Sequence, residues 1–334
     1  MKTVAFFNNK GGVGKTSLAY HLTYMYADLG LKVIVADFDP QANLSAMFLD
    51  DDDLAELWPD DAQHRTVLGA IAPLMNGTGD VATVHVRDVA DNIGLIVGDL
   101  GLSSFEDELS QQWPLCLDGK VRAFRVMSAF YRVLVDAARQ RNADLVLIDV
   151  GPNLGAINRS ALIAAEHVVI PLAPDLFSLQ GLKNLGPTLR TWRNGWEQRL
   201  ARNPDPGLAL PPVGMRPAGY AVLQHAMRLD RPVQAYGHWM DRIPGVYRRS
   251  VLGEKSDWPS DDGAANSLGL IKNYRSLMPM AMEARKPMFF LKPADGAIGA
   301  HSNAVRSCYN DFLGLAHTIA DACAIPLPQT VTVF

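Results

Sequence analysis

Short runs of apolar residues recur along the chain and alternate with longer segments of helical spacing. The runs are continuous rather than alternating, which is typical of strands that helices cover on both faces of a parallel sheet. We therefore predict an α/β fold with a doubly wound, mostly parallel sheet and helices on both faces. The predicted strands are Val4–Phe7, Val33–Ala36, Ile93–Val97, Leu145–Ile148, His167–Ile170 and Gly219–Leu223.

Two longer segments have the spacing of helices. One spans Thr16–Leu29 and ends at Gly30, because glycine is frequent just after the last turn of a helix. The other is a single long helix over Ala123–Arg139, which precedes the fourth strand. Segments rich in proline and glycine, Asn203–Pro217 and Gly253–Gly269, predict connectors.

Length and composition favour one folded domain over residues 1–334. The chain has 334 residues, of which 48% are hydrophobic and 20% charged, enough to bury a substantial core. Asp50–Asp61 holds seven acidic residues in twelve, so we interpret residues 50–65 as an exposed acidic insertion, a loop or a helix start. We expect residues 200–270 to form a variable region of this domain.

Charge and cysteine content argue against several classes of protein. The net charge of −4 means that any nucleic-acid binding requires a local basic patch. The three cysteines are scattered and lack metal spacing, which favours a reduced, cytoplasmic protein. No apolar run is long enough to span a membrane, and the last stretch lacks the basic face of an interfacial helix. We therefore expect no membrane partner.

A glycine-rich loop between the first strand and the first helix carries the chemistry. Glycines allow backbone N–H groups to wrap a phosphate, and the following helix N-terminus favours an anion. Lys15 is placed to reach the β- and γ-phosphates, and the Thr16 hydroxyl to bind Mg²⁺. Asn9 stands where the strict phosphate-loop pattern has its first glycine. The predicted nucleotide-binding residues are Lys10, Gly11, Gly12, Val13, Gly14, Lys15, Thr16 and Ser17.

This loop, with its second lysine, resembles the deviant phosphate loop of the ParA/MinD superfamily of P-loop ATPases. The resemblance is dense over residues 1–190 and thinner afterwards, and it implies P-loop NTPase topology. The Pro40-Gln41 pair is more like ParA-type partition ATPases than MinD. The other similar segments are Asp37–Asn43, the Walker B strand Asp144–Asp149, Ile170–Leu182, and Ile96–Leu100 with Glu106 and Leu109.

The resemblance implies roles for individual residues. Lys10 matches the signature lysine that crosses a dimer interface to the partner's phosphates, as an arginine finger would. Asp39 matches the residue that positions the attacking water, and Asp149 the Walker B acid near Mg²⁺. Asp37 we interpret as a structural hydrogen-bonding residue. The implied catalytic residues are Lys10, Lys15 and Asp39, and the implied magnesium ligands are Thr16, Asp39 and Asp149.

The chain departs from the family pattern after the Walker B strand. The family commonly has Asp-Thr-Pro-Pro, and this chain has Asp149-Val150-Gly151-Pro152. We expect the loss of a hydroxyl and a proline to loosen this loop, which affects hydrolysis and conformational coupling rather than nucleotide binding.

The stretch Arg190–Arg275 is locally basic, with thirteen Lys and Arg against eight Asp and Glu, and aromatic residues are interleaved. Such residues suit nonspecific DNA binding through phosphates, and ParA-type dimers bind DNA in this way. Surface arginines beside core tryptophans are the alternative interpretation. Arg248 and Arg249 are the candidate DNA contacts.

The resemblance implies an ATP-dependent, dimerising ATPase with Mg²⁺ and ATP as cofactors and slow, partner-stimulated hydrolysis. It would bind the nucleoid and position a plasmid, chromosome or large cargo together with an adaptor of ParB type. The alternative is a regulatory or scaffold switch for secretion, defence or MinD-like positioning. A reductase resembling nitrogenase iron protein is disfavoured by the cysteine pattern.

Overall fold

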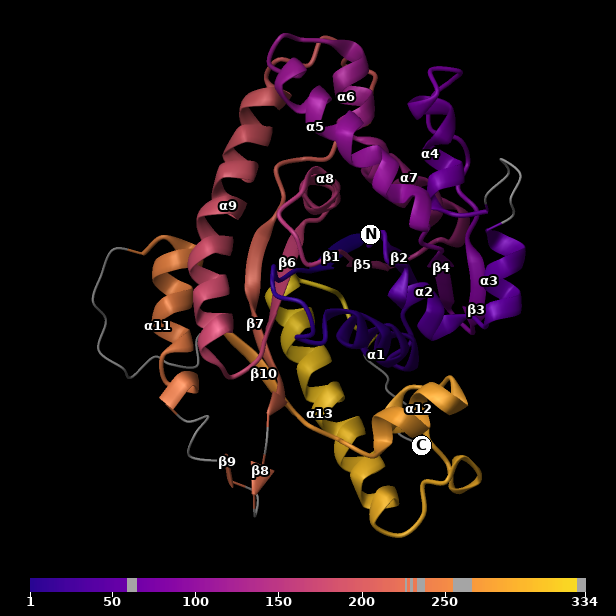
Figure 1. The fold of residues 1–334 in the computed structure, drawn as a ribbon, viewed down its shortest axis with the longest axis vertical. Helices are drawn as coiled ribbons and strands as arrows, with labels where there is room; N and C mark the ends of the chain where they lie inside the picture. The colour runs from indigo at the N-terminus through magenta and orange to yellow at the C-terminus, as the bar shows by residue number, and fades with distance from the viewer. Residues whose placement is uncertain (59–64, 226, 229–230, 233–237, 255–265, 329–334) are drawn as a thin grey trace.

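The computed structural model describes residues 1–334 except 59–64, 226, 229–230, 233–237, 255–265 and 329–334. Its centre is a sheet of eight strands in the order β10-β7-β6-β1-β5-β2-β4-β3 (Figure 1). All neighbouring pairs are parallel except β3 with β4 at one edge. The strands are β1 Lys2–Phe6, β2 Val33–Asp37, β3 Arg87–Ala90, β4 Ile93–Ile96, β5 Leu145–Asp149, β6 His167–Leu172, β7 Arg216–His225 and β10 Ser267–Lys272. This confirms the predicted α/β class.

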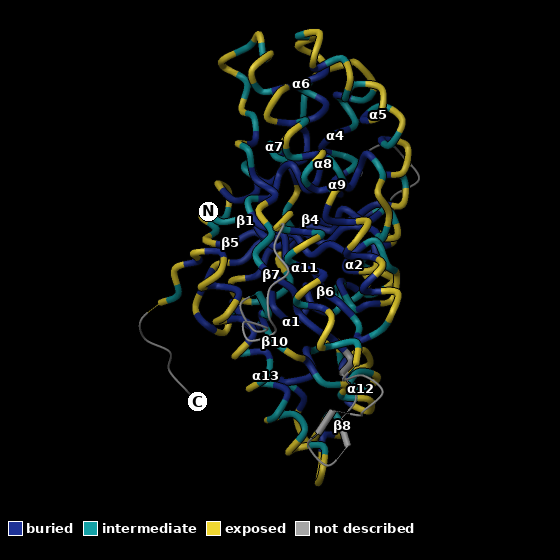
Figure 2. The backbone as a smooth tube through the Cα atoms, turned by 90° about the vertical axis from the view of Figure 1, so that its left-hand side faces the viewer, coloured by how far each residue is buried: buried dark blue, intermediate teal, exposed yellow. Residues whose placement is uncertain are grey.

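Helices cover both faces of the sheet, as the continuous apolar strands predict. One face carries α4 to α9 and α11, and the other carries α1 to α3, α12 and α13. Figure 2 shows the buried residues concentrated between these layers. Successive residues of a strand serve opposite layers, since Ala5 packs into the first and Val4 and Phe6 into the second.

The helices vary widely in length. The long ones are α1 Lys15–Asp28, α7 Ala129–Arg141, α9 Leu176–Leu200 and α13 Ala300–Cys323. The shorter ones are α2 Asn43–Phe48, α3 Asp51–Leu57, α4 Val67–Met75, α5 Phe105–Leu115, α6 Val121–Met127, α8 Ala156–Ile163, α11 Ile243–Tyr247 and α12 Leu277–Ala284. A π-helical turn, η2 Arg248–Leu252, continues α11, and 3₁₀ turns span η1 Leu100–Ser104, η4 Met288–Phe290 and η5 Pro293–Asp295. A two-residue ladder joins β8 Met227–Arg228 to β9 Arg231–Pro232.

The prediction of one long helix over Ala123–Arg139 is wrong. The segment forms α6 and α7, which are separated at Ser128. The backbone of Ser128 has φ −94° and ψ 2°, outside the helical region, and its buried hydroxyl donates to the carbonyl of Arg125. A serine that bonds locally to the backbone competes with the helix at that point.

The predicted connectors and the acidic stretch are partly described. Residues up to Met215 before β7 are irregular, as predicted, whereas the last three residues of the second predicted connector, 267–269, begin the edge strand β10. Most of Gly253–Gly269 lies outside the described residues. The acidic stretch begins as helix α3, with the Asp50 carboxylate accepting from the Asp53 N–H at 2.8 Å. Residues 59–64 of that stretch lie outside the description. None of the described helices combines the length and hydropathy needed to cross a bilayer.

Candidate functional site

Three strands that lie side by side end at the predicted site. β5 pairs with β1 on one side and with β2 on the other, so that Phe6, Asp149 and Asp37 lie in register. Because parallel strands end at the same edge of a sheet, the loops that follow them meet there. These loops connect β1 to α1, β2 to α2, and β5 to α8.

The loop after β1 has the backbone geometry of an anion-binding site. Gly12 and Gly14 have φ angles of 72° and 89°, which residues with side chains rarely adopt. Gly14 is also the N-cap of α1, whose first turn has neither a side-chain cap nor an acidic residue. The N–H groups and dipole of this helix start therefore favour a bound phosphate.

Lys15 is a buried cation beside two carboxylates. Only 6% of the residue is exposed, and its Nζ donates to the carbonyl of Lys10 at 3.4 Å. Burial lowers the pKa of Lys15, while the nearby carboxylates of Asp149 and Asp39 oppose the shift. The amine is thus held within the loop after β1.

Asp149 is a fully buried carboxylate with capacity for further ligands. Neither of its oxygens accepts a hydrogen bond of normal geometry from the described residues, although the Thr16 hydroxyl lies close enough to lower its pKa. Burial and the charge of Asp37 outweigh that effect and raise the pKa of Asp149. Buried polar groups in native proteins are nearly always satisfied, so a cation that reaches this carboxylate would be stabilised.

This donor set fits magnesium. A hydroxyl at Thr16 with the carboxylates of Asp39 and Asp149 offers the oxygen ligands that Mg²⁺ prefers. Among the residues that the structure describes, no group of three or more His, Cys, Asp or Glu side chains is placed to hold a metal alone. Phosphate and water oxygens would therefore complete the shell, as is usual for Mg²⁺ bound with a nucleotide.

Asp37 and Asp39 differ in their surroundings. Both the N–H and the hydroxyl of Ser45 donate to Asp37 Oδ2 at 2.8 Å, so Asp37 is the structural hydrogen-bonding residue that the sequence predicts. Asp39 is 6% exposed and accepts from the Gln41 N–H at 3.0 Å. A Cβ on Gly151 would lie 3.2 Å from Asp39 Oδ1, so the loops after β2 and β5 touch at this carboxylate.

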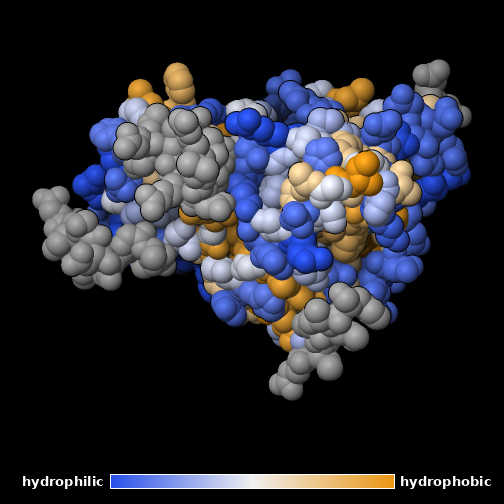
Figure 3. All heavy atoms as spheres, turned by 90° about the horizontal axis from the view of Figure 1, so that it is seen from below, coloured by the Kyte–Doolittle hydropathy of each residue, from blue (hydrophilic) through white to orange (hydrophobic). Residues whose placement is uncertain are grey.

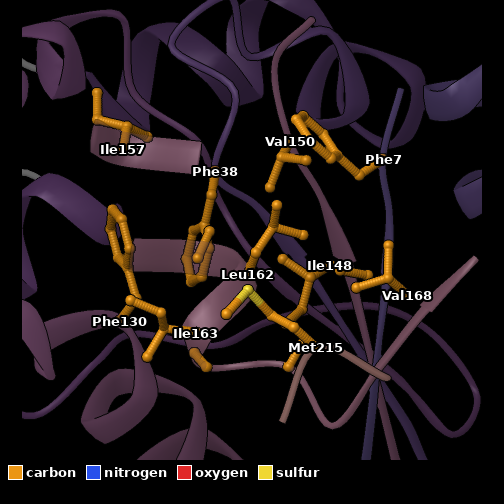
Figure 4. Close-up of a cluster of buried hydrophobic side chains, with 14 of the residues drawn as sticks. Phe7, Phe38, Phe130, Ile148, Val150, Ile157, Leu162, Ile163, Val168 and Met215 are labelled. Carbon is orange, nitrogen blue, oxygen red and sulfur yellow. The ribbon is translucent and has the colours of Figure 1, made fainter. Parts of the chain in front are cut away.

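The loop after β5 makes specific contacts at the positions where it departs from the family pattern. The Val150 side chain is fully buried and packs in the apolar cluster of Figure 4 with Phe38. Asn158 Nδ2 donates to the carbonyls of Gly151 and Asn153 at 2.8 and 2.7 Å. The buried Val150 side chain and the hydrogen bonds from the Asn158 amide therefore hold this loop, where the family pattern has a hydroxyl.

A cavity of about 690 Å³ opens beside the phosphate loop. One wall of it is α12, which the sequence did not assign to the site, and Arg285 and Lys286 just after this helix also line it. Figure 3 shows the α12 end of the molecule, where hydrophobic side chains lie among hydrophilic ones. A second hollow of about 230 Å³ adjoins at the ends of β7 and β10. The residues around the first cavity are Gly11, Gly12, Gly14, Lys15, Thr16, Ser17, Tyr20, His21, Asp39, Gln41, Asn43, Ala46, Met47, Pro152, Met278, Ala281, Met282, Arg285 and Lys286.

Two predicted nucleotide-binding residues do not line this cavity. Val13 is buried beneath the loop with 1% exposure. Lys10 extends toward the start of α9, where its Nζ pairs with the Asp175 carboxylate and lies 5.6 Å from the centre of the Phe177 ring. Neither Asp175 nor Phe177 was singled out from the sequence as a partner of Lys10, because 165 positions separate Lys10 from Asp175.

Both candidate DNA contacts lie on η2, which continues α11, and both elements pack against α9 (Figure 1). Arg249 is exposed, whereas Arg248 is half-buried and interacts within the fold. Arg190 donates to the carbonyls of Ser250 and Val251, and the buried Arg199 stacks on Trp113 at 3.7 Å. Part of the basic stretch is therefore structural, and its tryptophans at 192 and 196 are core residues.

Comparison with known proteins agrees with this geometry. A family model described as an AAA domain matches residues 1–201. The chromosome partitioning protein ParA of Caulobacter vibrioides is 30% identical over 200 residues, which are 60% of this chain and 66% of that protein, slightly less than two thirds of its length. Protein DIP2308 of Corynebacterium diphtheriae has the same fold, with a TM-score of 0.72 at 22% identity over 96% of this chain and 98% of that one. McdA of Cyanothece, solved as an ATP complex, aligns with a TM-score of 0.65 at 15% identity over 99% of each chain. The chain therefore belongs to the ParA/MinD superfamily of P-loop ATPases.

Proposed function

We propose that this protein binds Mg-ATP at the loop after β1, dimerises around the nucleotide, and hydrolyses it slowly until a partner accelerates the reaction. The observation that carries the proposal is the buried Lys15 beside the unsatisfied Asp149 carboxylate, at a helix start built for phosphate. A cation at the start of α1 and a carboxylate at the end of β5 suit the phosphates and the metal ion of Mg-ATP.

Different residues of the chain bind the phosphates, bind the metal ion and orient the attacking water. The first turn of α1 and Lys15 hold the phosphates, and Thr16, Asp39 and Asp149 would hold Mg²⁺, which neutralises phosphate charge when bound. Asp39, fixed by the Gln41 N–H, orients the attacking water at the mouth of the cavity. Lys10 acts on the nucleotide of a second copy.

We further propose that the dimer positions a plasmid, a chromosome or another large cargo with an adaptor of ParB type, and that it associates with the nucleoid. Support comes from the relatives, since the Caulobacter vibrioides protein is named for chromosome partitioning. Nonspecific DNA binding would use exposed arginines, and Arg242 at the N-cap of α11 and Arg249 on η2 are the best placed.

A regulatory or scaffold switch without DNA binding is the second candidate. It is favoured by the number of arginines in the basic stretch that the fold itself uses, namely Arg190 and Arg199. The nucleotide site is the same in both candidates, so DNA binding decides between them.

Replacement of Lys15 by alanine tests the shared site. Lys15→Ala removes the cation that neutralises phosphate charge, and we expect Mg-ATP affinity measured by calorimetry to fall at least about thirtyfold, because removing one member of a buried charge pair costs several kcal/mol. Lys183→Ala, at an exposed position of α9, is the matched control and should bind normally. Wild-type affinity in Lys15→Ala would show that the nucleotide site is elsewhere.

A further inference from the structure

The ammonium group of Lys10 has partners within its own chain. Its Nζ pairs with Asp175 Oδ2 and lies over the Phe177 ring at 5.6 Å from the centroid. The Lys10 and Asp175 side chains are 28% and 35% exposed, so the pair is partly shielded from water. A group expected to act on another chain is therefore occupied in the single chain.

Asp175 is placed by the start of α9. It is the N-cap of this helix, and its Oδ1 accepts from the Ser178 N–H at 2.8 Å while Oδ2 faces Lys10. A Cβ on Gly181 would lie 3.1 Å from Asn9 Oδ1, so the next turn of α9 presses against the residue before Lys10. Partial burial would raise the pKa of Asp175, but the hydrogen bonds from Lys10 and Ser178 outweigh it and lower that pKa. The carboxylate is thus a fixed, ionised partner.

Phe177 is the second contact, and its position is unusual for a phenyl ring. It is 71% exposed, and the preceding Leu176 is 53% exposed. A cation over a ring face gains about 0.5–1 kcal/mol at exposed sites. The ring therefore adds to the attraction that holds Lys10.

We propose that Asp175 and Phe177 hold Lys10 inside the single chain and so set the threshold for dimerisation. The proposal rests on the role of Lys10 proposed above. Lys10 cannot contact the phosphates of another copy while it pairs with Asp175, so the bound nucleotide of the partner must compete for the same ammonium group. Asp175 and Phe177 are positioning residues in this account and touch no substrate.

The variant Asp175→Asn separates the two tasks of this side chain. Asparagine keeps the acceptor that caps α9 but removes the negative charge. We expect ATP-dependent dimers to form at about threefold to tenfold lower protein concentration, the scale of a partly exposed ion pair with a ring contact. Phe177→Leu keeps an apolar side chain without the ring face and should give a smaller shift. Asp107→Asn, exposed on α5, is the matched control.

An independent measurement follows Lys10 in the nucleotide-free chain. Acylation of its amine, quantified by peptide mass spectrometry against Lys183, should be faster in Asp175→Asn than in the wild type. Unchanged labelling, or an unchanged or raised dimerisation threshold in Asp175→Asn, would overturn the proposal. If labelling rises but no variant dimerises with ATP, the proposed dimer fails, and the threshold role fails with it, while the ion pair stands.

Discussion

Two adjacent residues at the end of β5 have opposite environments. Asp149 is a fully buried carboxylate beside Lys15, with its pKa raised by burial, and Val150 packs in the apolar layer below. A buried charge is costly unless a partner compensates it. Lys15 is such a partner, and a bound cation would be another. Val150 therefore anchors the loop in the apolar layer, and the unsatisfied carboxylate of Asp149 would be stabilised by a bound metal ion.

Replacing Val150 by threonine restores the hydroxyl of the family pattern and tests this arrangement. Because the side chain is fully buried in apolar surroundings, the hydroxyl would lack a partner. We expect Val150→Thr to lower the free energy of unfolding in urea by about 1–3 kcal/mol. Val121→Thr, at a position 39% exposed, should change it little. Equal stabilities would mean that residue 150 faces the site instead of the core.

Among single residues, the sequence predicted those site residues that are close together along the chain. The loop from Lys10 to Ser17 is one continuous segment, and glycines beside lysine and threonine define it without any tertiary information. The ion pair of Lys10 with Asp175 and the cavity wall of α12 join distant segments. No local pattern specifies where such segments meet.

Among elements, β1, β2, β4, β5, β6 and the core of β7 were predicted because two covered faces require a continuous apolar run. The edge strands were not. β3 is Arg87–Ala90, with no buried residue, and only Leu268 and Ile271 of β10 are buried. Neither segment has the continuous apolar run that is typical of a strand covered on both faces. Pairing with the neighbouring strand, and not the local sequence pattern, therefore makes β3 and β10 strands.

His21 connects α1 to the segment before α13. Its Nδ1 lies 2.7 Å from the carbonyl of Ser17 and its Nε2 accepts from the Met288 N–H at 3.1 Å, with Phe312 stacked on the ring. A second proton would place an N–H against the Met288 N–H. Complete burial also disfavours the charged ring, and it lowers the pKa of His21 to about 4.

This geometry makes stability depend on pH. Unfolded His21 binds a proton near pH 6.5 and folded His21 only near pH 4, so the unfolded state gains protons first as the pH falls. The protein should lose up to about 3 kcal/mol of stability from this residue between these values. His21→Gln, which keeps an acceptor for Met288, should flatten the difference in urea stability between pH 7 and pH 4.5. An identical pH dependence in both proteins would contradict the account.

For the whole molecule, charge distribution limits DNA binding. The chain is acidic overall at −4, and the exposed Arg242 before α11 and Arg249 on η2 give one chain few phosphate contacts. A dimer doubles those contacts, and linked sites bind far more tightly than single ones.

We therefore predict nonspecific duplex binding that requires ATP and falls steeply with added salt. Arg249→Glu should weaken it, with or without the same change at Arg248, and leave nucleotide affinity unchanged. Arg139→Glu, exposed at the end of α7, is the control. Fluorescence anisotropy on random-sequence duplex with ATP, ADP or no nucleotide is the measurement. Absence of binding in all three states at low salt would favour the scaffold function.

The nucleotide-dependent dimer is the central claim, and the variant Asp39→Ala tests it most directly. Without the carboxylate that orients water, ATP should bind and persist, so light scattering should find twice the mass of one chain with Mg-ATP. The same variant should remain a single chain with ADP or without nucleotide, and it should release no phosphate. A single chain under saturating Mg-ATP, or wild-type turnover by Asp39→Ala, would contradict the account.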